Sequence, residues 1–220
     1  TGATSEMDVE NQFRLLVGNN LKAQGHRARP RYPGPARYDF NFVNASVDLG
    51  RLCENLAKRA NGKLLLYGPP GSGKTAFAYH LAEQLDRPLI TRRASDLIKP
   101  LLGETELKIA SMFRDAGTDN AVLLLDEADS FLQDRQHAAR SWEVTQVNEL
   151  LTQMECFEGL FLCATNFRQN VDSAALRRFG LKIEFDYLNP EQSKKLYRAT
   201  LAECGCEFWD DLAMARAESE

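Results

Sequence analysis

The sequence predicts an α/β fold in which helices cover both faces of a five-stranded parallel sheet. Five short apolar segments alternate with longer segments of helical periodicity, which is the order expected for a parallel sheet. A glycine-rich loop joins one apolar segment to the helix after it, and an acidic pair ends another, as is typical of ligand-binding sheet edges. The predicted strands are 63–67, 87–91, 121–125, 160–164 and 181–185.

Residues with strong positional preferences mark several element ends. The segment 47–60 has apolar residues at helical spacing and is followed by Asn61-Gly62, which is typical of a helix C-terminus. Asn189-Pro190 supplies an N-cap and a first-turn proline for the last helix. The strand at 181–185 alternates between apolar and charged residues, as an edge strand does. The predicted helices are 47–60, 75–85, 104–116, 142–155 and 190–203.

The chain divides into three parts by composition. Residues 1–37 are polar and include a basic stretch with Pro and Gly, so we expect an N-terminal arm or linker with a short helix at 11–21. Residues 38–186 hold the predicted strands and are expected to form the α/β domain. Residues 187–220 hold one helix and a charged tail.

The composition limits the classes of function. The chain has 220 residues, of which 44% are hydrophobic and 26% charged, as in an ordinary soluble globular domain. Its net charge of −4 gives no support for a nucleic-acid surface, and no apolar run reaches membrane-spanning length. Five cysteines without C-x-x-C spacing indicate a reducing cytoplasm, and Cys204-Gly-Cys206 is disfavoured as a metal or redox pair.

A glycine-rich segment after the first predicted strand fits a phosphate-binding loop. Gly68-Pro-Pro-Gly-Ser-Gly-Lys-Thr75 matches the spacing G-x-x-x-x-G-K-[ST], and its glycines let backbone N–H groups approach phosphate closely. Lys74 supplies a positive charge to the β- and γ-phosphates, and the Thr75 hydroxyl is a ligand for Mg²⁺. A chance Gly/Pro turn is the alternative, which the flanking strand and helix disfavour. The residues expected to bind nucleotide here are Pro70, Gly71, Ser72, Gly73, Lys74 and Thr75.

An acidic segment, Asp126-Glu-Ala-Asp129, ends the third predicted strand. Ligands of open parallel sheets lie beyond the carboxyl ends of the strands. Asp126 is therefore expected to bind nucleotide by facing a Mg²⁺ ion held by Thr75, and Glu127 to polarise a water for attack on the γ-phosphate. Asp129 stays open between a role in this site and a helix N-terminus favoured by the helix dipole.

With these motifs in place, the chain resembles the AAA family of ATPases over about residues 38–205. Gly68–Thr75 is similar to the Walker A motif of the family and Leu123–Glu127 to its Walker B motif. The resemblance implies the three-layer α/β/α fold of P-loop NTPases, followed by a partial helical lid. It also implies ATP and Mg²⁺ as cofactors, and assembly into a hexameric ring that remodels or unfolds proteins.

Two further segments resemble family segments that act in hydrolysis. Ala164-Thr-Asn166 is similar to sensor 1, so the resemblance implies that Asn166 positions the attacking water; a turn or helix cap is the alternative. Residues 171–179 are similar to the segment that carries the arginine fingers. The resemblance implies that Arg177 and Arg178 reach the γ-phosphate bound by a neighbouring subunit, whereas two adjacent arginines alone are more often a solvated helix end.

The chain departs from the family pattern in three places. Leu101–Gly103 aligns with the pore loop, where many members carry an aromatic residue that grips an extended polypeptide. We expect a protein substrate to be threaded past Leu101–Gly103 with an altered grip, unless these leucines are buried loop anchors. Val144-Thr145 stands where several members carry an arginine pair. The segment 187–220 is shorter than the usual lid, which implies a truncated or short lid. The resemblance implies a homo-oligomer, and with such a lid we expect weak ring formation, with a monomer as the alternative.

The leading functional prediction is a Mg²⁺-dependent ATP hydrolase that remodels a protein substrate in the cytoplasm. The predicted catalytic residues are Glu127, Asn166, Arg177 and Arg178, and the predicted metal ligands are Thr75 and Asp126. The alternative is a nucleotide-gated binding or scaffold module with little turnover. The acidic balance of the chain disfavours a DNA-directed motor, and the lack of an H-E-x-x-H motif disfavours a zinc protease.

Overall fold

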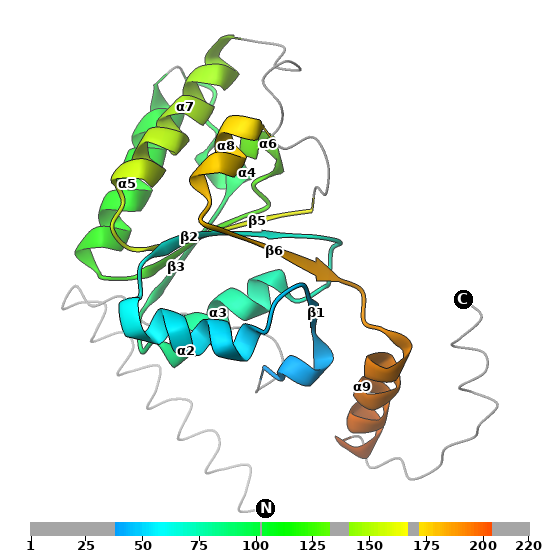
Figure 1. Cartoon of the computed structure of the whole chain (residues 1–220). Coiled ribbons are helices and arrows are strands. Elements are labelled where there is room, and N and C mark those ends of the chain that lie inside the picture. Colours follow the sequence, from blue (N-terminus) through cyan, green and yellow to red (C-terminus); the bar gives the residue numbers. More distant parts are fainter. Residues whose placement is uncertain (1–37, 102, 133–140, 167–171, 204–220) are drawn as a thin grey trace, which may run out of the picture. The chain divides into compact units, whose positions relative to one another are not determined.

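Six strands form one mixed sheet in the part of the chain that the computed structural model describes, namely residues 38–101, 103–132, 141–166 and 172–203. Their order is β1-β6-β2-β5-β4-β3 (Figure 1). The five strands from β2 to β6 all run parallel to one another, and β1 pairs antiparallel with β6. The strands are β1 (Asn44–Ala45), β2 (Gly62–Tyr67), β3 (Leu89–Arg93), β4 (Val122–Asp126), β5 (Leu160–Thr165) and β6 (Leu181–Asp186).

The predicted α/β class and its five parallel strands are confirmed, but the predicted strand count of five is wrong. The additional strand, β1, has two residues and is too short to show a period in the sequence. Its Ala45 pairs with Phe185, so β6 lies between β1 and β2 and is not the edge strand that its alternation indicates. β3 also begins later than predicted, after Pro88, because proline has no N–H to donate to a sheet.

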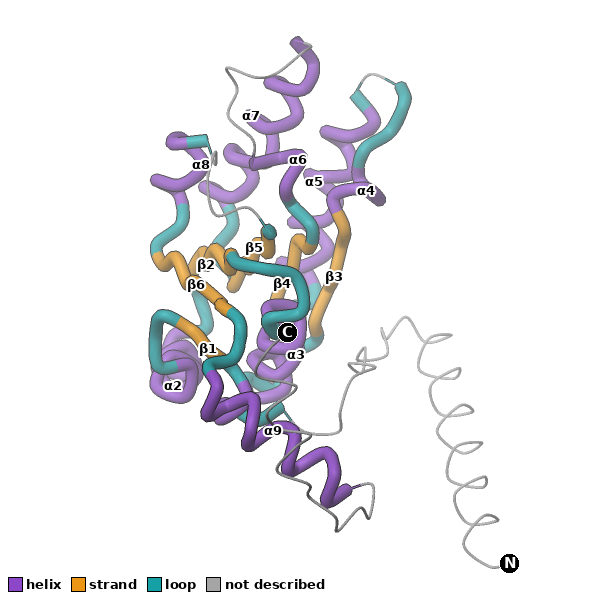
Figure 2. Tube along the Cα trace, turned by 90° about the vertical axis from the view of Figure 1, so that its right-hand side faces the viewer, coloured by secondary structure: helices purple, strands orange, loops and turns teal. Residues whose placement is uncertain are grey.

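Helices cover both faces of the sheet. Figures 1 and 2 show α2 and α3 against one face, and α5 and α7, with the shorter α4, α6 and α8, on the other. The five longest helices agree with the predicted ones to within a few residues, whereas the shortest elements have too few turns to show helical periodicity. The helices are η1 (Phe40–Phe42, 3-10), α2 (Leu49–Arg59), α3 (Lys74–Gln84), α4 (Ala94–Leu97), α5 (Glu104–Thr118), α6 (Asp129–Leu132), α7 (Ser141–Cys156), α8 (Ser173–Arg178) and α9 (Pro190–Glu203).

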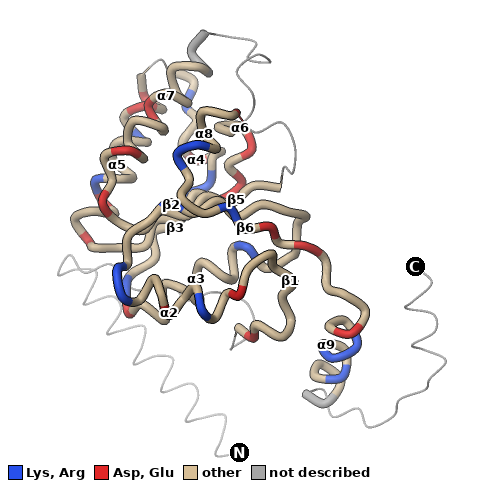
Figure 3. The backbone as a smooth tube through the Cα atoms, in the orientation of Figure 1, with Lys and Arg blue, Asp and Glu red and all other residues tan. Residues whose placement is uncertain are grey.

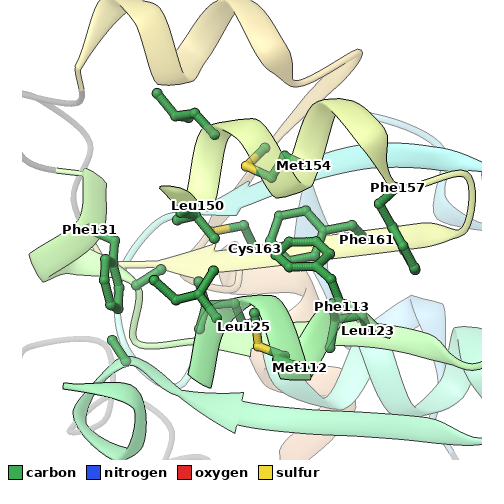
Figure 4. Close-up of a cluster of buried hydrophobic side chains, with 14 of the residues drawn as sticks. Met112, Phe113, Leu123, Leu125, Phe131, Leu150, Met154, Phe157, Phe161 and Cys163 are labelled. Atoms are coloured by element: carbon green, nitrogen blue, oxygen red, sulfur yellow. The ribbon is translucent and has the colours of Figure 1, made fainter. Parts of the chain in front are cut away.

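Alternate residues of the central strands pack into two buried clusters, one on each face of the sheet. Leu66 of β2 belongs to the cluster under α2 and α3, and the preceding Leu65 belongs to the cluster under α5 and α7. In the second cluster, drawn in Figure 4, the Phe113 ring lies 5.2 Å from Phe161 and 5.4 Å from Phe157 between ring centroids. Because both faces are covered, these strands are apolar throughout, and each large side chain contributes about 1.5–3 kcal/mol by its burial.

Two helix ends were predicted from their sequence, with different outcomes. The N-cap of α9 is confirmed, because Gln192 N donates to Asn189 Oδ1 at 2.8 Å and Asn189 N donates back to Gln192 Oε1 at 3.1 Å. Gln192 Nε2 also donates to Val43 O at 2.9 Å, which fastens α9 to the residue after η1. At the end of α2 it is Ala60, not Asn61-Gly62, that adopts a left-handed φ of 35°, because Gly62 already belongs to β2.

Several predictions fall on residues that the structure does not describe. They concern the helix at 11–21, Leu102 of the predicted pore loop, Val171 and the pair Cys204 and Cys206. None of the helices in the described part of the chain combines the length and the hydropathy that a membrane crossing needs.

Candidate active site

The predicted phosphate, metal and water-positioning residues meet at one edge of the sheet. β2, β5 and β4 are neighbours in the sheet (Figure 2). They run parallel, so their carboxyl ends lie side by side. The first residues after these strands are Gly68, Asn166 and Glu127. This edge is where ligands bind in open parallel sheets, and the sheet order explains how segments far apart in the sequence come together.

The loop from Gly68 to Thr75 leads from β2 into α3, and its geometry favours glycine at Gly68, Gly71 and Gly73. A Cβ on Gly68 would lie 1.8 Å from the carbonyl oxygen of Phe185. Gly73 precedes α3 with φ 95°, a left-handed conformation that glycine adopts at no steric cost. Ser72 Oγ donates to Pro69 O at 2.8 Å, which holds the turn of the loop. The exposed residues of the loop are Pro70 and Gly71.

The side chain of Lys74 lies within the loop and reaches across to β5. Its Nζ donates to the carbonyl oxygens of Gly68 and Pro69, both at 2.8 Å, and to Asn166 Oδ1 at 3.1 Å. Lys74 is only 7% exposed, and this burial lowers its pKa. The negative charges of Asp126 and Asp129 raise the pKa in opposition, so the ammonium group is held by both charge and hydrogen bonds.

Thr75 and Asp126 contact each other directly, from α3 and the end of β4. Thr75 Oγ1 donates to Asp126 Oδ2 at 2.8 Å, and the other carboxylate oxygen accepts from Glu127 N at 2.9 Å. A hydroxyl and a carboxylate oxygen at this separation are the hard ligands that Mg²⁺ prefers, so these residues fit such an ion. Glu127 is exposed and has φ 52°, so a left-handed turn sets where its carboxylate projects.

Asp129 connects the turn after β4 to the end of β5. Its Oδ1 accepts from the Thr165 hydroxyl and, at 3.0 Å, from the backbone N–H of Asn166. The sequence left the role of Asp129 open, and it suggested no role for Thr165. The only available signal for Thr165 was a hydroxyl at the last position of a buried apolar strand.

The two predicted arginine fingers have different surroundings in the last turn of α8, which is blue in Figure 3. Asp172 caps this helix by accepting from Ala174 N at 2.7 Å. Arg178 Nε lies 2.7 Å from Glu155 Oε1 of α7, and its Nη1 donates to Ala174 O at 2.8 Å. Arg177 is exposed. The structure therefore gives Arg178 a partner within its own chain and directs Arg177 to the surface.

Exposed aliphatic side chains lie in and beside the predicted pore-loop segment. Leu101 is 63% exposed, so it is not the buried loop anchor that the alternative interpretation requires. Gly103 follows with φ 84° and precedes α5. Ile98 and Leu107, on either side of this segment, are 44% and 71% exposed.

A cluster of aromatic rings lies beside the loop from Gly68 to Thr75, and it was not predicted from the sequence. Tyr38 stacks on His80 of α3 with ring centroids 5.0 Å apart, and Phe40 approaches both rings edge-on at 5.5 and 5.1 Å. The Tyr38 hydroxyl lies 3.9 Å from the position that a Cβ on Gly73 would take. Burial lowers the pKa of His80, against the charge of Glu83. The close spacing of Tyr38 and Phe40 was the available signal for this cluster.

Comparison with known proteins adds a family to this geometry. The family described as ATPase family associated with various cellular activities (AAA) matches residues 64–187, which is more than half of the chain.

Individual relatives are similar to this chain over a limited part of their own length. Peroxisomal ATPase PEX1 of Saccharomyces cerevisiae is 33% identical over 167 residues, which cover 74% of this chain and 15% of that protein. The uncharacterized AAA family ATPase y4kL of Sinorhizobium fredii is 34% identical over 131 residues, 58% of this chain and 40% of that protein. A 26S proteasome regulatory subunit 6B homolog of Aspergillus niger is 34% identical over 149 residues, 63% and 35% respectively. The chain therefore spans less than half the length of each.

Proposed function

Because the chain belongs to the AAA family of ATPases, we propose that it binds ATP together with Mg²⁺ and hydrolyses it to ADP and phosphate. One observation carries this proposal: Lys74 contacts Asn166, and the adjacent Thr75 contacts Asp126, at the same edge of the sheet. These four residues bring together a cation for phosphate, two hard oxygen ligands and a polar amide. That combination suits phosphoryl transfer, in which positioning and charge stabilisation do most of the work.

Thr75 and Asp126 are the residues that would hold the magnesium ion. Within the described residues, no group of three His, Cys, Asp or Glu side chains could hold a metal ion by themselves. We therefore expect Mg²⁺ to bind together with the nucleotide, since this ion completes its coordination with phosphate oxygens and water. When bound, it neutralises the charge that develops on the phosphates.

The remaining proposed roles are supported by the positions of Lys74, Glu127 and Asn166. Lys74 would exchange the carbonyl oxygens of Gly68 and Pro69 for phosphate oxygens, which are stronger acceptors for an ammonium group. Glu127 would take a proton from the attacking water, and Asn166 would hold that water or sense the γ-phosphate. Glu127 follows β4 and Asn166 follows β5, and these two strands are neighbours in the sheet.

The coupling of hydrolysis to work on proteins is a further part of the proposal. We expect a homo-oligomeric ring in which Arg177 and Arg178 act on the nucleotide of a neighbouring copy, in the cytoplasm. We expect a protein substrate to pass Leu101–Gly103, where the exposed side chain of Leu101 would contact it without an aromatic grip. A proteasome regulatory subunit homolog among the relatives supports a role on proteins.

Phosphate release by the wild type and by Glu127→Gln, with Mg²⁺ titrated, tests this function at high protein concentration. Loss of a general base lowers turnover by about 100-fold or more, while binding of a fluorescent ATP analogue should persist. Glu158→Gln is the matched control, because Glu158 is exposed and precedes β5, at the opposite edge of the sheet. Wild-type turnover in Glu127→Gln would contradict the role of Glu127. Tight nucleotide binding without turnover in the wild type would point instead to a nucleotide-gated scaffold.

A further inference from the structure

Contacts at successive residues join the turn after β4 to the end of β5. Ala128 N donates to Ala164 O at 2.9 Å. Asp129 Oδ1 then accepts two hydrogen bonds, one from the hydroxyl of Thr165 and one from the backbone N–H of Asn166, the latter at 3.0 Å. The two segments that end in candidate catalytic residues are therefore fastened to each other beside the site.

The carboxylate of Asp129 is directed to β5 and not to its own helix. Asp129 is the first residue of α6, where an acidic side chain commonly bonds to N–H groups of the first turn. The hydrogen bonds that the structure gives this side chain, within the described residues, go instead to the end of β5. Thr165 is 1% exposed, so its hydroxyl makes this bond away from bulk water, where a charged acceptor is most effective.

Asn166 links Asp129 to the groups that face the nucleotide. Its backbone N–H is bound by Asp129, and its side-chain Oδ1 accepts from Lys74 Nζ at 3.1 Å. Asn166 as a whole is exposed, so side-chain packing does little to hold it. The position of its side-chain amide therefore depends on the hydrogen bond from Lys74 and on how its backbone is anchored.

We propose that Asp129 is a positioning residue for the proposed ATP hydrolysis, which it serves by fixing the backbone of Asn166. Through Thr165 and the N–H of Asn166, it keeps the Asn166 amide aligned with Glu127, which lies two residues before Asp129 on the same turn. The left-handed φ of 52° at Glu127 restricts the backbone conformation of this turn. The inference rests on the proposed function, because this alignment matters only where Asn166 and Glu127 act on one water molecule.

Steady-state ATP hydrolysis distinguishes positioning from a merely structural role. Asp129→Ala removes the acceptor of both donors and is expected to lower kcat about tenfold or more, with KM for ATP changed less than about threefold. Asp129→Asn keeps an acceptor oxygen and Thr165→Ser keeps the hydroxyl, so both should retain most of the wild-type kcat, whereas Thr165→Val should not. Ser130→Ala changes an exposed neighbour on α6 and is the matched control. A wild-type kcat in Asp129→Ala would overturn the proposal.

A double-mutant cycle tests whether Asp129 acts through Asn166. If it does, Asp129→Ala lowers kcat by no more than about twofold when Asn166 is already alanine, because the positioned group is gone. A second loss as large as the loss in the wild-type background would overturn the proposed route.

Hydrogen exchange of the backbone N–H of Asn166, followed by NMR without nucleotide, measures its hydrogen bond to Asp129 independently of hydrolysis. This hydrogen bond is called the tether below. Asp129→Ala should reduce its protection about tenfold or more, and Ser130→Ala should leave it unchanged. Unchanged protection in Asp129→Ala, with an active wild type, would overturn this inference alone. Absence of hydrolysis in the wild type would instead overturn the proposed function, and the positioning role with it, even where the exchange result shows that the tether exists.

Discussion

At the scale of single residues, Lys74 illustrates how its surroundings set the chemistry of a side chain. Burial lowers its pKa, while Asp126 and Asp129 oppose that effect, and three oxygen atoms accept hydrogen bonds from its Nζ. An ammonium group kept out of water is costly unless such partners are present. Phosphate oxygens satisfy it better than carbonyl oxygens, which is a physical reason for nucleotide to stabilise this site.

The buried thiol of Cys53 predicts a loss of stability in alkali. Burial raises the pKa of this α2 side chain from 9.0 to about 11, so the unfolded chain loses this proton at lower pH than the folded one. The contribution to stability is full below pH 9 and is lost as the pH rises to about 11. The free energy of unfolding should therefore fall less steeply over this interval in Cys53→Ala than in the wild type.

Urea unfolding at several pH values measures this slope. Cys156→Ala removes an exposed thiol of α7 and is the control for the substitution itself. Burial also raises the pKa of Cys163, which adds to the alkaline loss in every variant and cancels from the comparison. Equal slopes for Cys53→Ala and the wild type would show that Cys53 does not contribute as described.

At the scale of elements, substitution by alanine should change the stability of the fold in opposite directions at two glycines, Gly68 and Gly117. Gly68→Ala would place a Cβ 1.8 Å from a backbone carbonyl of β6, so we expect a destabilisation of about 3 kcal/mol or more. Gly117 lies near the end of α5, where an added Cβ would meet no atom within 4 Å and φ is not positive, so Gly117→Ala should stabilise the protein by about 0.5 kcal/mol. Thermal unfolding measures both, and a stable Gly68→Ala would contradict the close approach of β2 and β6.

The surroundings of α8 predict different consequences for its two arginines. Arg177→Ala should lower turnover in the proposed ring by about a thousandfold without affecting stability, because Arg177 is exposed and its proposed target lies on a neighbouring copy. Arg178→Ala should lower turnover and, in addition, lower the free energy of unfolding by up to about 1 kcal/mol, because it removes the partly exposed ion pair with Glu155.

Glu155→Gln separates these effects, since it weakens the same pair and keeps both arginines. Turnover and thermal unfolding of the three variants, measured together, check the assignment. Equal loss of turnover in Arg177→Ala and Arg178→Ala, with no loss of stability in either, would show that the ion pair of Arg178 with Glu155 does not stabilise the packing of α8 on α7.

The sequence predicted the long elements and the meeting of the glycine-rich loop with the acidic segment, because periodicity and strand-end rules apply to them directly. It could not predict β1 or α6, which are too short to show a period. It also could not show that the Asp129 carboxylate turns toward Thr165, or that Arg178 pairs with Glu155. Those contacts depend on side-chain direction and on the packing of elements that are distant in the sequence.

At the scale of the whole molecule, the order of the sheet gathers the residues proposed to face the nucleotide, while α8 presents Arg177 at its surface. In the proposed ring, the last charge-stabilising group comes from a second copy. A site divided in this way works only when copies assemble, so that its rate depends on protein concentration.

The most direct test is ATP hydrolysis by the purified chain over a wide range of protein concentration, with light scattering on the same samples. We expect a specific activity that rises as assemblies form, and an Arg177→Ala variant that assembles equally without this rise. A specific activity that stays the same at every concentration, from a chain that remains monomeric throughout, would contradict a site completed by a neighbouring copy.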